Sequence, residues 1–564
     1  MKRTRSSSLT TTSNFPTMNT FNVISRRSFL GRTAGATAAL AALTDIPFVM
    51  QQALADGLIG RVGPNGKVKK LLFIFLRGAN DGLNNVLPYG DTAYNKTNRP
   101  SLYLTPDAGQ DWSTSGPAYY PQSGPNGSVF GPTAFNAATQ EYYGGLALGN
   151  GFAGLHPSLK FLAPVYNAGD LAILHRVGYP RQSRSHFDSQ NYWETGVPRT
   201  SLTKDGVFYR AMFESGLTSS NALTGVSFQS SLPLSLRGSA AAMTNITDTG
   251  RYNLLGIPND AAGNAKADQF LQAGSHARFA DKRNRDLLTL QYQNLTSTLQ
   301  LFADLQPQFT ENYVDAAVTD GDQPYTLFPL SNATNGSYGK NASPNKYVVP
   351  GGDYGFFAQL KNAAIILNKT DAIIAGTQLD GFDTHSNQGA STGQQPGLLR
   401  RVGWAMYALR RYFLQHADKC AWDDVCVVTM SEFGRTTIEN QDHGTDHAEA
   451  SVMYVAGGSV KGYQAAGAGQ SGRTGVFGAD PKDPAGLTWQ TGQTGSMFGV
   501  ESRYLKRSID YRSVLGKLIR SHLGASDDQM GRIIPRYNEP TEMLKTGGIQ
   551  AQDKTTVLGE PDIV

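Results

Sequence analysis

The sequence has few cysteines and almost no net charge outside its first 55 residues, and each absence excludes a class of protein. Two cysteines in 564 residues cannot support a disulfide-rich scaffold. Of the 50 Lys and Arg and 45 Asp and Glu, six cations and one anion lie in residues 1–55, so the remainder carries 44 of each sign. A body without net positive charge lacks the surface that nucleic-acid binding requires, so we expect no nucleic-acid partner.

Long hydrophobic runs are also missing. The most apolar stretch, residues 71–76, has the length of a strand, whereas a helix that crosses a bilayer needs about 20 apolar residues. We therefore expect no stable membrane span. What is present is a hydrophobic fraction of 40% with 10% aromatics, enough for a large core, and 62 Gly with 27 Pro, which indicate long loops.

Residues 1–55 have the pattern of an export signal. Arg26 and Arg27 precede a short, weakly apolar stretch rich in Ala and Gly, and residues 53–55 read Ala-Leu-Ala, a small-x-small cleavage site. The paired arginines followed by Phe-Leu resemble the twin-arginine (Tat) signal. We expect a protein that the Tat translocase exports, located in the periplasm or secreted, whose mature part is a single domain of residues 56–564.

Five apolar runs predict the scaffold of that domain: residues 71–76, 171–177, 371–379, 425–430 and 452–456. Each has strand length, ends in a polar or Gly-containing loop, and is separated from the next by helical stretches such as 398–415. This order predicts an α/β fold with a mostly parallel sheet sandwiched between helices. Residues near 100–150 and 200–350 break the pattern and are interpreted as loop-rich insertions.

Acidic residues and histidines follow several of these strands. Asp81 follows the first, Asp383 and His385 follow another, and Asp446 and His447 follow the fourth through a loop. The carboxyl ends of parallel strands meet at one edge of a sheet, so these side chains can converge. Oxygen and nitrogen donors of this kind suit Zn or Mn. Asp81 has an alternative interpretation, because Asn-Asp-Gly is also a turn sequence.

A serine and two arginines complete the candidate site. Ser185 precedes His186 at the start of an apparent helix, where the helix dipole and a metal could activate its hydroxyl as a nucleophile. The serine could equally cap the helix. Arg184 and Arg435 could bind the oxygens of an anionic group, or could be salt-bridge partners. Whether Cys420 and Cys426 pair is left open by the sequence.

Seven motifs in order resemble the family called domain of unknown function 1501. They are RGANDGLN (77–84), GLHP (154–157), SHF (185–187), FDTH (382–385), EFGRT (432–436), TDH (445–447) and DYR (510–512). That family looks like a branch of the alkaline phosphatase and sulfatase superfamily, which implies an alkaline phosphatase-like α/β fold with one or two metal ions beside a nucleophile.

The resemblance implies roles for individual residues. Asp81, Asp446 and His447 would bind one divalent ion and Asp383 with His385 another, with Ser185 as nucleophile. The superfamily adds a late histidine, for which this chain offers only His522 in an apparent helix; His186 is a substitute.

Two hypotheses follow from the sequence. The first is a metal-dependent hydrolase of a small or polymer-linked anionic ester, phosphate or sulfate, with Ser185, His186 and Arg435 in the catalytic set. No Cys lies in the nucleophile region, so a formylglycine mechanism is not expected. The second is a non-catalytic exported binding or accessory protein that retains the fold.

Overall fold

The computed structural model of the chain describes most of the part that follows the expected export signal. Its described residues are 66–105, 145–148, 150–219, 223–239, 243–249, 297–320, 323–330, 353–391, 393–467, 471–479 and 503–564, together with 59, 265, 266 and 269. All of them belong to one unit, Ile46–Val564. The expected signal, residues 1–55, and most of the expected insertion near 100–150 lie outside the described residues.

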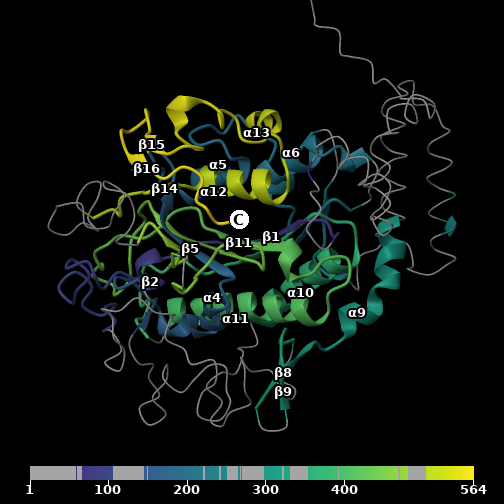
Figure 1. Cartoon of the computed structure of the whole chain (residues 1–564), viewed down its shortest axis with the longest axis horizontal. Helices are drawn as coiled ribbons and strands as arrows, with labels where there is room; N and C mark the ends of the chain where they lie inside the picture. Colours follow the sequence, from purple (N-terminus) through teal and green to yellow (C-terminus); the bar gives the residue numbers. More distant parts are fainter. Residues whose placement is uncertain are drawn as a thin grey trace, which may run out of the picture. The chain divides into compact units, whose positions relative to one another are not determined.

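A nine-stranded sheet forms the centre of this unit (Figure 1), in the order β13-β5-β12-β11-β1-β10-β6-β7, with β14 also paired to β5. The strands are β1 (Lys70–Leu76), β5 (Leu171–Gly178), β6 (Gly225–Phe228), β7 (Thr244–Asn245), β10 (Ile374–Leu379), β11 (Val425–Met430), β12 (Ser451–Ala456), β13 (Val476–Phe477) and β14 (Ile509–Asp510). All five expected strands are present. Residues 200–350, interpreted as an insertion, supply two further strands, β6 and β7.

One strand runs against the others. β1 pairs in parallel with β10 and β11, but β12 pairs antiparallel with both β11 and β5. The sheet is therefore mostly parallel, as expected from the sequence, and β12 is the strand whose reversed direction the sequence did not predict. Because β12 is reversed, the segment between β11 and β12 leaves and re-enters the sheet at the same edge.

Helices cover both faces of the sheet (Figure 1). One layer contains α4 (Ala163–Asn167), α10 (Tyr354–Lys369) and α11 (Gln394–Gln415), and the other contains α5 (His186–Thr195), α6 (Val207–Glu214), α12 (Tyr511–Lys517) and α13 (Asp527–Ile533). Every residue of β1 is buried, as expected for a strand with a hydrophobic layer on each side. The α/β sandwich expected from the sequence is confirmed at this level.

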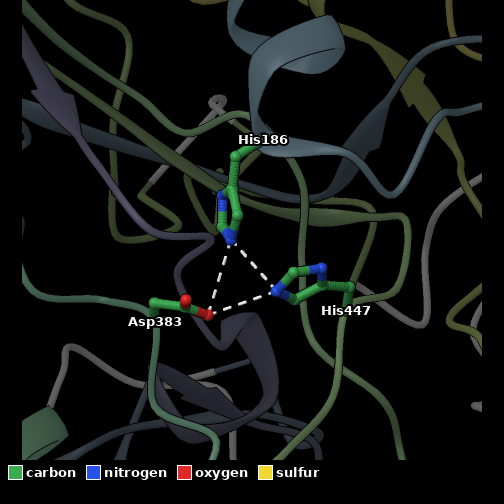
Figure 2. A group of neighbouring side chains, drawn as sticks. All are labelled: His186, Asp383 and His447. Carbon is green, nitrogen blue, oxygen red and sulfur yellow. Dashed lines mark hydrogen bonds and ion pairs between the residues drawn. The ribbon is translucent and has the colours of Figure 1, made fainter.

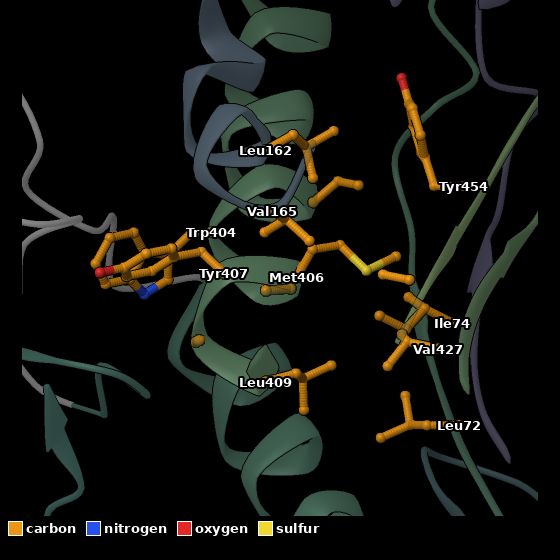
Figure 3. Close-up of a cluster of buried hydrophobic side chains, with 14 of the residues drawn as sticks. Leu72, Ile74, Leu162, Val165, Trp404, Met406, Tyr407, Leu409, Val427 and Tyr454 are labelled. Carbon is orange, nitrogen blue, oxygen red and sulfur yellow. The ribbon is translucent and has the colours of Figure 1, made fainter. Parts of the chain in front are cut away.

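Alternate side chains of β1 serve the two layers. Leu72 and Ile74 face α11, where Met406 and Leu409 meet them in one buried cluster (Figure 3). Phe73 points the other way and stacks on Phe208 of α6, with ring centroids 5.0 Å apart. This alternation explains why an unbroken apolar run is needed here.

Among the described residues, no helix is long and apolar enough to span a membrane.

Smaller elements complete the described part of the chain. They are η1 (Gly82–Asn84), β2 (Val86–Leu87), β3 (Leu146–Ala147), β4 (Gly154–Leu155), η3 (Pro157–Leu162), η4 (Leu217–Ser219), η5 (Leu234–Leu236), α9 (Gln306–Thr310), β8 (Val314–Asp320), β9 (Gln323–Thr326), η8 (Trp422–Asp424), the π-helical turn η10 (Leu518–His522), η11 (Pro540–Glu542), β15 (Gly548–Ile549) and β16 (Thr556–Val557). Cys420 and Cys426 are both buried and unpaired.

Candidate metal centre

The candidate site lies at the carboxyl edge of the sheet, where the segments after β1, β10 and β11 meet. The amide of Phe382 donates to the carbonyl of Arg77 (3.0 Å), and that of Thr445 donates to Thr384 (3.1 Å). Gly78 has φ 112°, and a Cβ there would lie 2.4 Å from the amide nitrogen of Asp383. A side chain cannot fit in that space, so the glycine in the first motif allows these segments to touch.

Two histidines and an aspartate from three different segments converge at this edge (Figure 2). The Nε2 atoms of His186 and His447 lie 3.0 Å apart, and Oδ1 of Asp383 lies 3.2 Å from His447 Nε2 and 3.5 Å from His186 Nε2. Ligands bound to one tetrahedral ion at 2.0–2.1 Å stand about 3.3 Å apart. The three atoms therefore have the separation of atoms that share a metal ion.

The outer nitrogens of the two imidazoles fix which inner atoms carry lone pairs. His447 Nδ1 lies 2.9 Å from the carbonyl oxygen of Arg184, which can only accept, so Nδ1 carries the proton. His186 Nδ1 lies 2.9 Å from Oε1 of Glu432, which makes this nitrogen a donor too. The Nε2 atoms of His186 and His447 then carry no proton, and their lone pairs point toward each other beside Oδ1 of Asp383. A cation placed between these atoms would satisfy their lone pairs.

A third histidine joins the group from the side. His385 Nε2 lies 2.9 Å from His447 Nε2 and 3.1 Å from Asp383 Oδ1, while its Nδ1 lies 3.4 Å from Oδ1 of Asp446. A proton on His186 would satisfy one of the two nitrogen–nitrogen contacts of His447 and leave the other unsatisfied. The atoms close enough to share one ion are those of His186, Asp383 and His447, and a divalent ion there would satisfy the lone pairs of both of these imidazoles. Nitrogen and carboxylate donors suit zinc or manganese.

Charged neighbours set the protonation of these groups. Burial would raise the pKa of Asp383, but the Arg435 guanidinium outweighs it and lowers that pKa to about 2. The hydrogen bond to Glu432 raises the pKa of His186. Burial, together with Arg435, lowers the pKa of His447. The aspartate is thus ionised and His447 neutral near pH 7, which are the forms that bind metals.

Asp446 lies beside the convergence and does not point into it. Its Oδ2 accepts from Arg503 (2.8 Å) and its Oδ1 from Asn440 (3.0 Å). Through Oδ1 it also faces His385, 3.4 Å from Nδ1 of that histidine. The structure therefore places Asp446 beside the converging atoms, whereas the sequence predicted it as a ligand.

Asp81 is engaged elsewhere, although it lies at the same edge. Its carboxylate forms a fully buried ion pair with Arg99 (2.8 Å) and also accepts from Gln388 (2.7 Å) and from the amide of Leu83 (3.1 Å). Both oxygens are occupied by protein donors. The prediction that Asp81 binds a metal does not agree with this geometry, because an arginine supplies the positive charge.

Arg435 is likewise committed to the protein. Its side chain is buried, donates to the carbonyls of Gly78, Ala79, Phe382 and Thr445, and forms an ion pair with Asp383. All of these are contacts within the chain, so the guanidinium holds the strand-end segments together and orients a ligand. This arrangement does not agree with the predicted role of Arg435 in binding the substrate.

Ser185 caps α5. Its hydroxyl accepts from the amide of Asp188 at 3.4 Å, and no described contact joins it to the converging atoms. The capping interpretation is therefore confirmed. The cap hydrogen bond is long, so it holds the Ser185 hydroxyl only weakly. His522, the late histidine, bonds the carbonyl of Lys70 at the beginning of β1, at the opposite edge from the site.

Three residues of the site escaped the sequence analysis: Glu432, Arg99 and Arg503. Glu432 stands in a recognised motif, and its acidic side chain two residues after the end of β11 was a usable signal. Arg99 and Arg503 lie in stretches without periodicity, and nothing in their neighbourhood indicates that they neutralise Asp81 and Asp446.

Comparison with known protein families gives one match. A family model described as "Protein of unknown function (DUF1501)" matches residues 68–476. The chain belongs to the DUF1501 family. A comparison with curated proteins finds no match. The DUF1501 match includes His186, Asp383, His385 and His447, so the whole convergence lies within the part that defines the family.

Proposed function

We propose that this DUF1501 protein is a metal-dependent hydrolase of an anionic ester, phosphate or sulfate, related to the alkaline phosphatase and sulfatase superfamily. The observation that carries the proposal is the convergence of His186 Nε2, His447 Nε2 and Asp383 Oδ1 with their lone pairs directed at one another. A divalent ion held there would supply Lewis-acid polarisation of the ester.

The chain's own residues provide the rest of the site. Phe433 packs against the rings of His186 (4.8 Å between centroids) and His447 (5.0 Å), which limits water on that side and strengthens electrostatic interactions. Arg503 and Arg184 are partly exposed and lie beside the cluster. Guanidinium groups bind the oxygens of phosphate and sulfate well, so Arg184 keeps the role expected from the sequence and Arg503 takes the role expected of Arg435.

Ser185 supplies the nucleophilic hydroxyl in this proposal. It directly precedes His186 and begins α5, so its oxygen lies at the positive end of the helix dipole. Its cap hydrogen bond to Asp188 is long, at 3.4 Å, and can be given up without a large loss. Attack by this oxygen on phosphorus or sulfur would break the bond to the substrate's alcohol, which leaves with the proton that Ser185 loses. Water would then hydrolyse the covalent ester, which releases the phosphate or sulfate group and restores the Ser185 hydroxyl.

The test combines metal analysis with an ester screen. Purified protein should contain zinc or manganese, and turnover of phosphate or sulfate esters should be lost on chelation and restored by the metal. Asp383→Asn should lose both metal and turnover, whereas Ser185→Ala should lose turnover and keep its metal. A metal-free protein that still hydrolyses esters would contradict the proposal.

A second candidate, a non-catalytic binding or accessory protein, has one specific observation in its favour. Arg435 and Asp81, two of the residues expected to act on substrate or metal, are both consumed in buried contacts within the chain. Wild-type protein that holds metal but turns over no ester in the screen would favour this candidate.

Export by the Tat route is also part of the proposal. It rests on Arg26 and Arg27 and the small-x-small site at 53–55. Replacing both arginines with Lys should leave precursor in the cytoplasm, measured by fractionation. Normal periplasmic levels of the double variant would contradict it.

A further inference from the structure

The charged side chains around the convergence have a net negative charge. One divalent ion together with one singly charged substrate would neutralise it. Three carboxylates (Asp383, Glu432 and Asp446) contact the three histidines through hydrogen bonds or ion pairs. Two guanidinium groups pair with two of these carboxylates, Arg435 with Asp383 and Arg503 with Asp446. The neutral imidazoles add nothing, so this set carries one more negative than positive charge. One divalent ion would leave a single positive charge, and two ions would leave three.

Asp81, which the sequence predicted as a metal ligand, is already occupied by donors of the protein. Asp81 is the carboxylate at this edge nearest in sequence to β1, and its two oxygens accept four hydrogen bonds from Arg99, Gln388 and the Leu83 amide. Arg99 is equally saturated, because it also donates to Asn84 and to the carbonyls of residues 436 and 437. Asp81 and Arg99 are fully buried and together carry no net charge.

The flanking arginine Arg184 does not change this balance. It forms an ion pair with Glu449 (3.1 Å), so the two charges cancel. Its guanidinium stacks on the ring of Tyr504 at 3.7 Å, and the guanidinium of Arg503 lies 5.9 Å from the same ring. Tyr504 thus holds two guanidinium groups beside the convergence, where they can meet the oxygens of an anionic group.

From this arrangement we propose a single-ion centre selective for esters that carry one negative charge, a sulfate monoester or a phosphodiester, over the dianionic phosphate monoester. The inference rests on the proposed hydrolytic function. A monoanion neutralises the single positive charge of the loaded site, whereas a dianion leaves an excess negative charge beside three carboxylates. The excess negative charge makes binding of the dianionic ester less favourable, and this repulsion is the main source of selectivity for the monoanionic ester.

The first experiment does not depend on turnover. Metal-free protein is titrated with Zn²⁺, and we expect one ion per chain in the wild type and in Asp81→Asn, with affinities within about threefold. Two ions per chain, or loss of an ion in Asp81→Asn, would overturn the single-ion centre. If Asp81→Asn does not fold, the wild-type stoichiometry decides alone.

The second experiment compares three substrates at about pH 8, where a phosphate monoester is a dianion. We expect kcat/KM for para-nitrophenyl sulfate or bis(para-nitrophenyl) phosphate to exceed that for para-nitrophenyl phosphate by about tenfold or more. A preference for para-nitrophenyl phosphate would overturn the inference and leave the hydrolase proposal intact. No turnover of any of the three by metal-loaded protein would count against the hydrolase proposal itself.

A charge variant makes the comparison sharper. Glu449→Gln removes one negative charge beside Arg184 without touching the converging atoms, and should shift the monoanion-to-dianion ratio toward the dianion by about threefold. Glu560→Gln is the matched control. Glu560 also pairs with an arginine, Arg520, two residues before His522 at the opposite edge of the sheet. An equal shift in both variants, or none in Glu449→Gln, would contradict the charge argument.

Discussion

Replacing Glu432 with Gln tests whether the orientation of His186 matters for metal binding. Glu432 is fully buried, and its Oε1 accepts from His186 Nδ1 (2.9 Å), Gln190 Nε2 (3.0 Å) and the Gly78 amide (2.8 Å). Its Oε2 has no hydrogen-bond partner among the described residues. The Gln side chain has the same shape and can keep its oxygen at the Oε1 position, so the change removes charge and leaves packing intact.

The expected loss follows from the strength of the contact. Replacing the partner of a metal-binding histidine typically weakens metal affinity 10- to 100-fold, which corresponds to about 1.4–2.7 kcal/mol. We expect a Kd for Zn²⁺ raised by that factor with unchanged stoichiometry, measured by competition with a chromophoric chelator. Glu432 raises the pKa of His186, so its loss should also lower the pH at which His186 becomes protonated in the metal-free protein, measured by NMR.

Glu194→Gln is the matched control for this prediction. Glu194 is buried at the far end of the same helix, α5, and pairs with Arg77 (2.7 Å) and the Ser235 amide (2.8 Å). Its replacement should lower the free energy of unfolding and leave the metal Kd unchanged. Wild-type affinity in Glu432→Gln, or equal weakening in both variants, would refute the role assigned to Glu432.

Three other outcomes follow from the described contacts. Ser185→Ala should cost about 1 kcal/mol of stability through loss of the cap and leave metal content unchanged, measured by denaturant unfolding and elemental analysis; loss of metal would contradict the assignment of ligands. Asp81→Ala should destabilise the protein by about 3–5 kcal/mol, because Arg99 would be buried without its partner; a loss below 1 kcal/mol would contradict this. Burial lowers the pKa of His156 to about 4 and of His175 to about 3. The unfolded chain therefore binds these protons first, and stability should fall as the pH drops from about 6.5 toward 4, by up to about 1.4 kcal/mol per pH unit for each histidine. Unfolding midpoints that stay constant over that range would refute it.

The sequence was sufficient for the strands and for a mostly parallel sheet, but not for the direction of β12. A doubly buried strand needs an unbroken apolar run, which is visible in any sequence, and all five runs became strands. The direction of β12 is not encoded in that run. It depends on whether the chain between β11 and β12 crosses the sheet or turns back at its edge, and the local residues look alike in both cases.

The residues of the site also fall into those that the sequence could predict and those that it could not. The positions of Asp383, His385 and His447 could be anticipated, because each follows from a strand end or a tight turn close in sequence. The roles of Asp81 and Arg435 could not, because their partners are distant in sequence or are backbone carbonyls. Arg99 reaches Asp81 from a turn-rich stretch, and four carbonyls that bind Arg435 carry no residue-specific signal.

The two buried arginines explain how this edge keeps its shape without relying on an ion. Arg435 connects the segments after β1, β10 and β11 through carbonyl oxygens, and Arg99 connects Asp81 to residues 436 and 437. Each guanidinium supplies the positive charge that the surrounding carbonyl oxygens and carboxylates require. The histidines and Asp383 are thus held by contacts that exist before any metal binds. A metal centre of the proposed kind would differ from small zinc domains, in which the metal itself drives folding, because here the protein supplies the scaffold and an ion would satisfy only the lone pairs of the convergence.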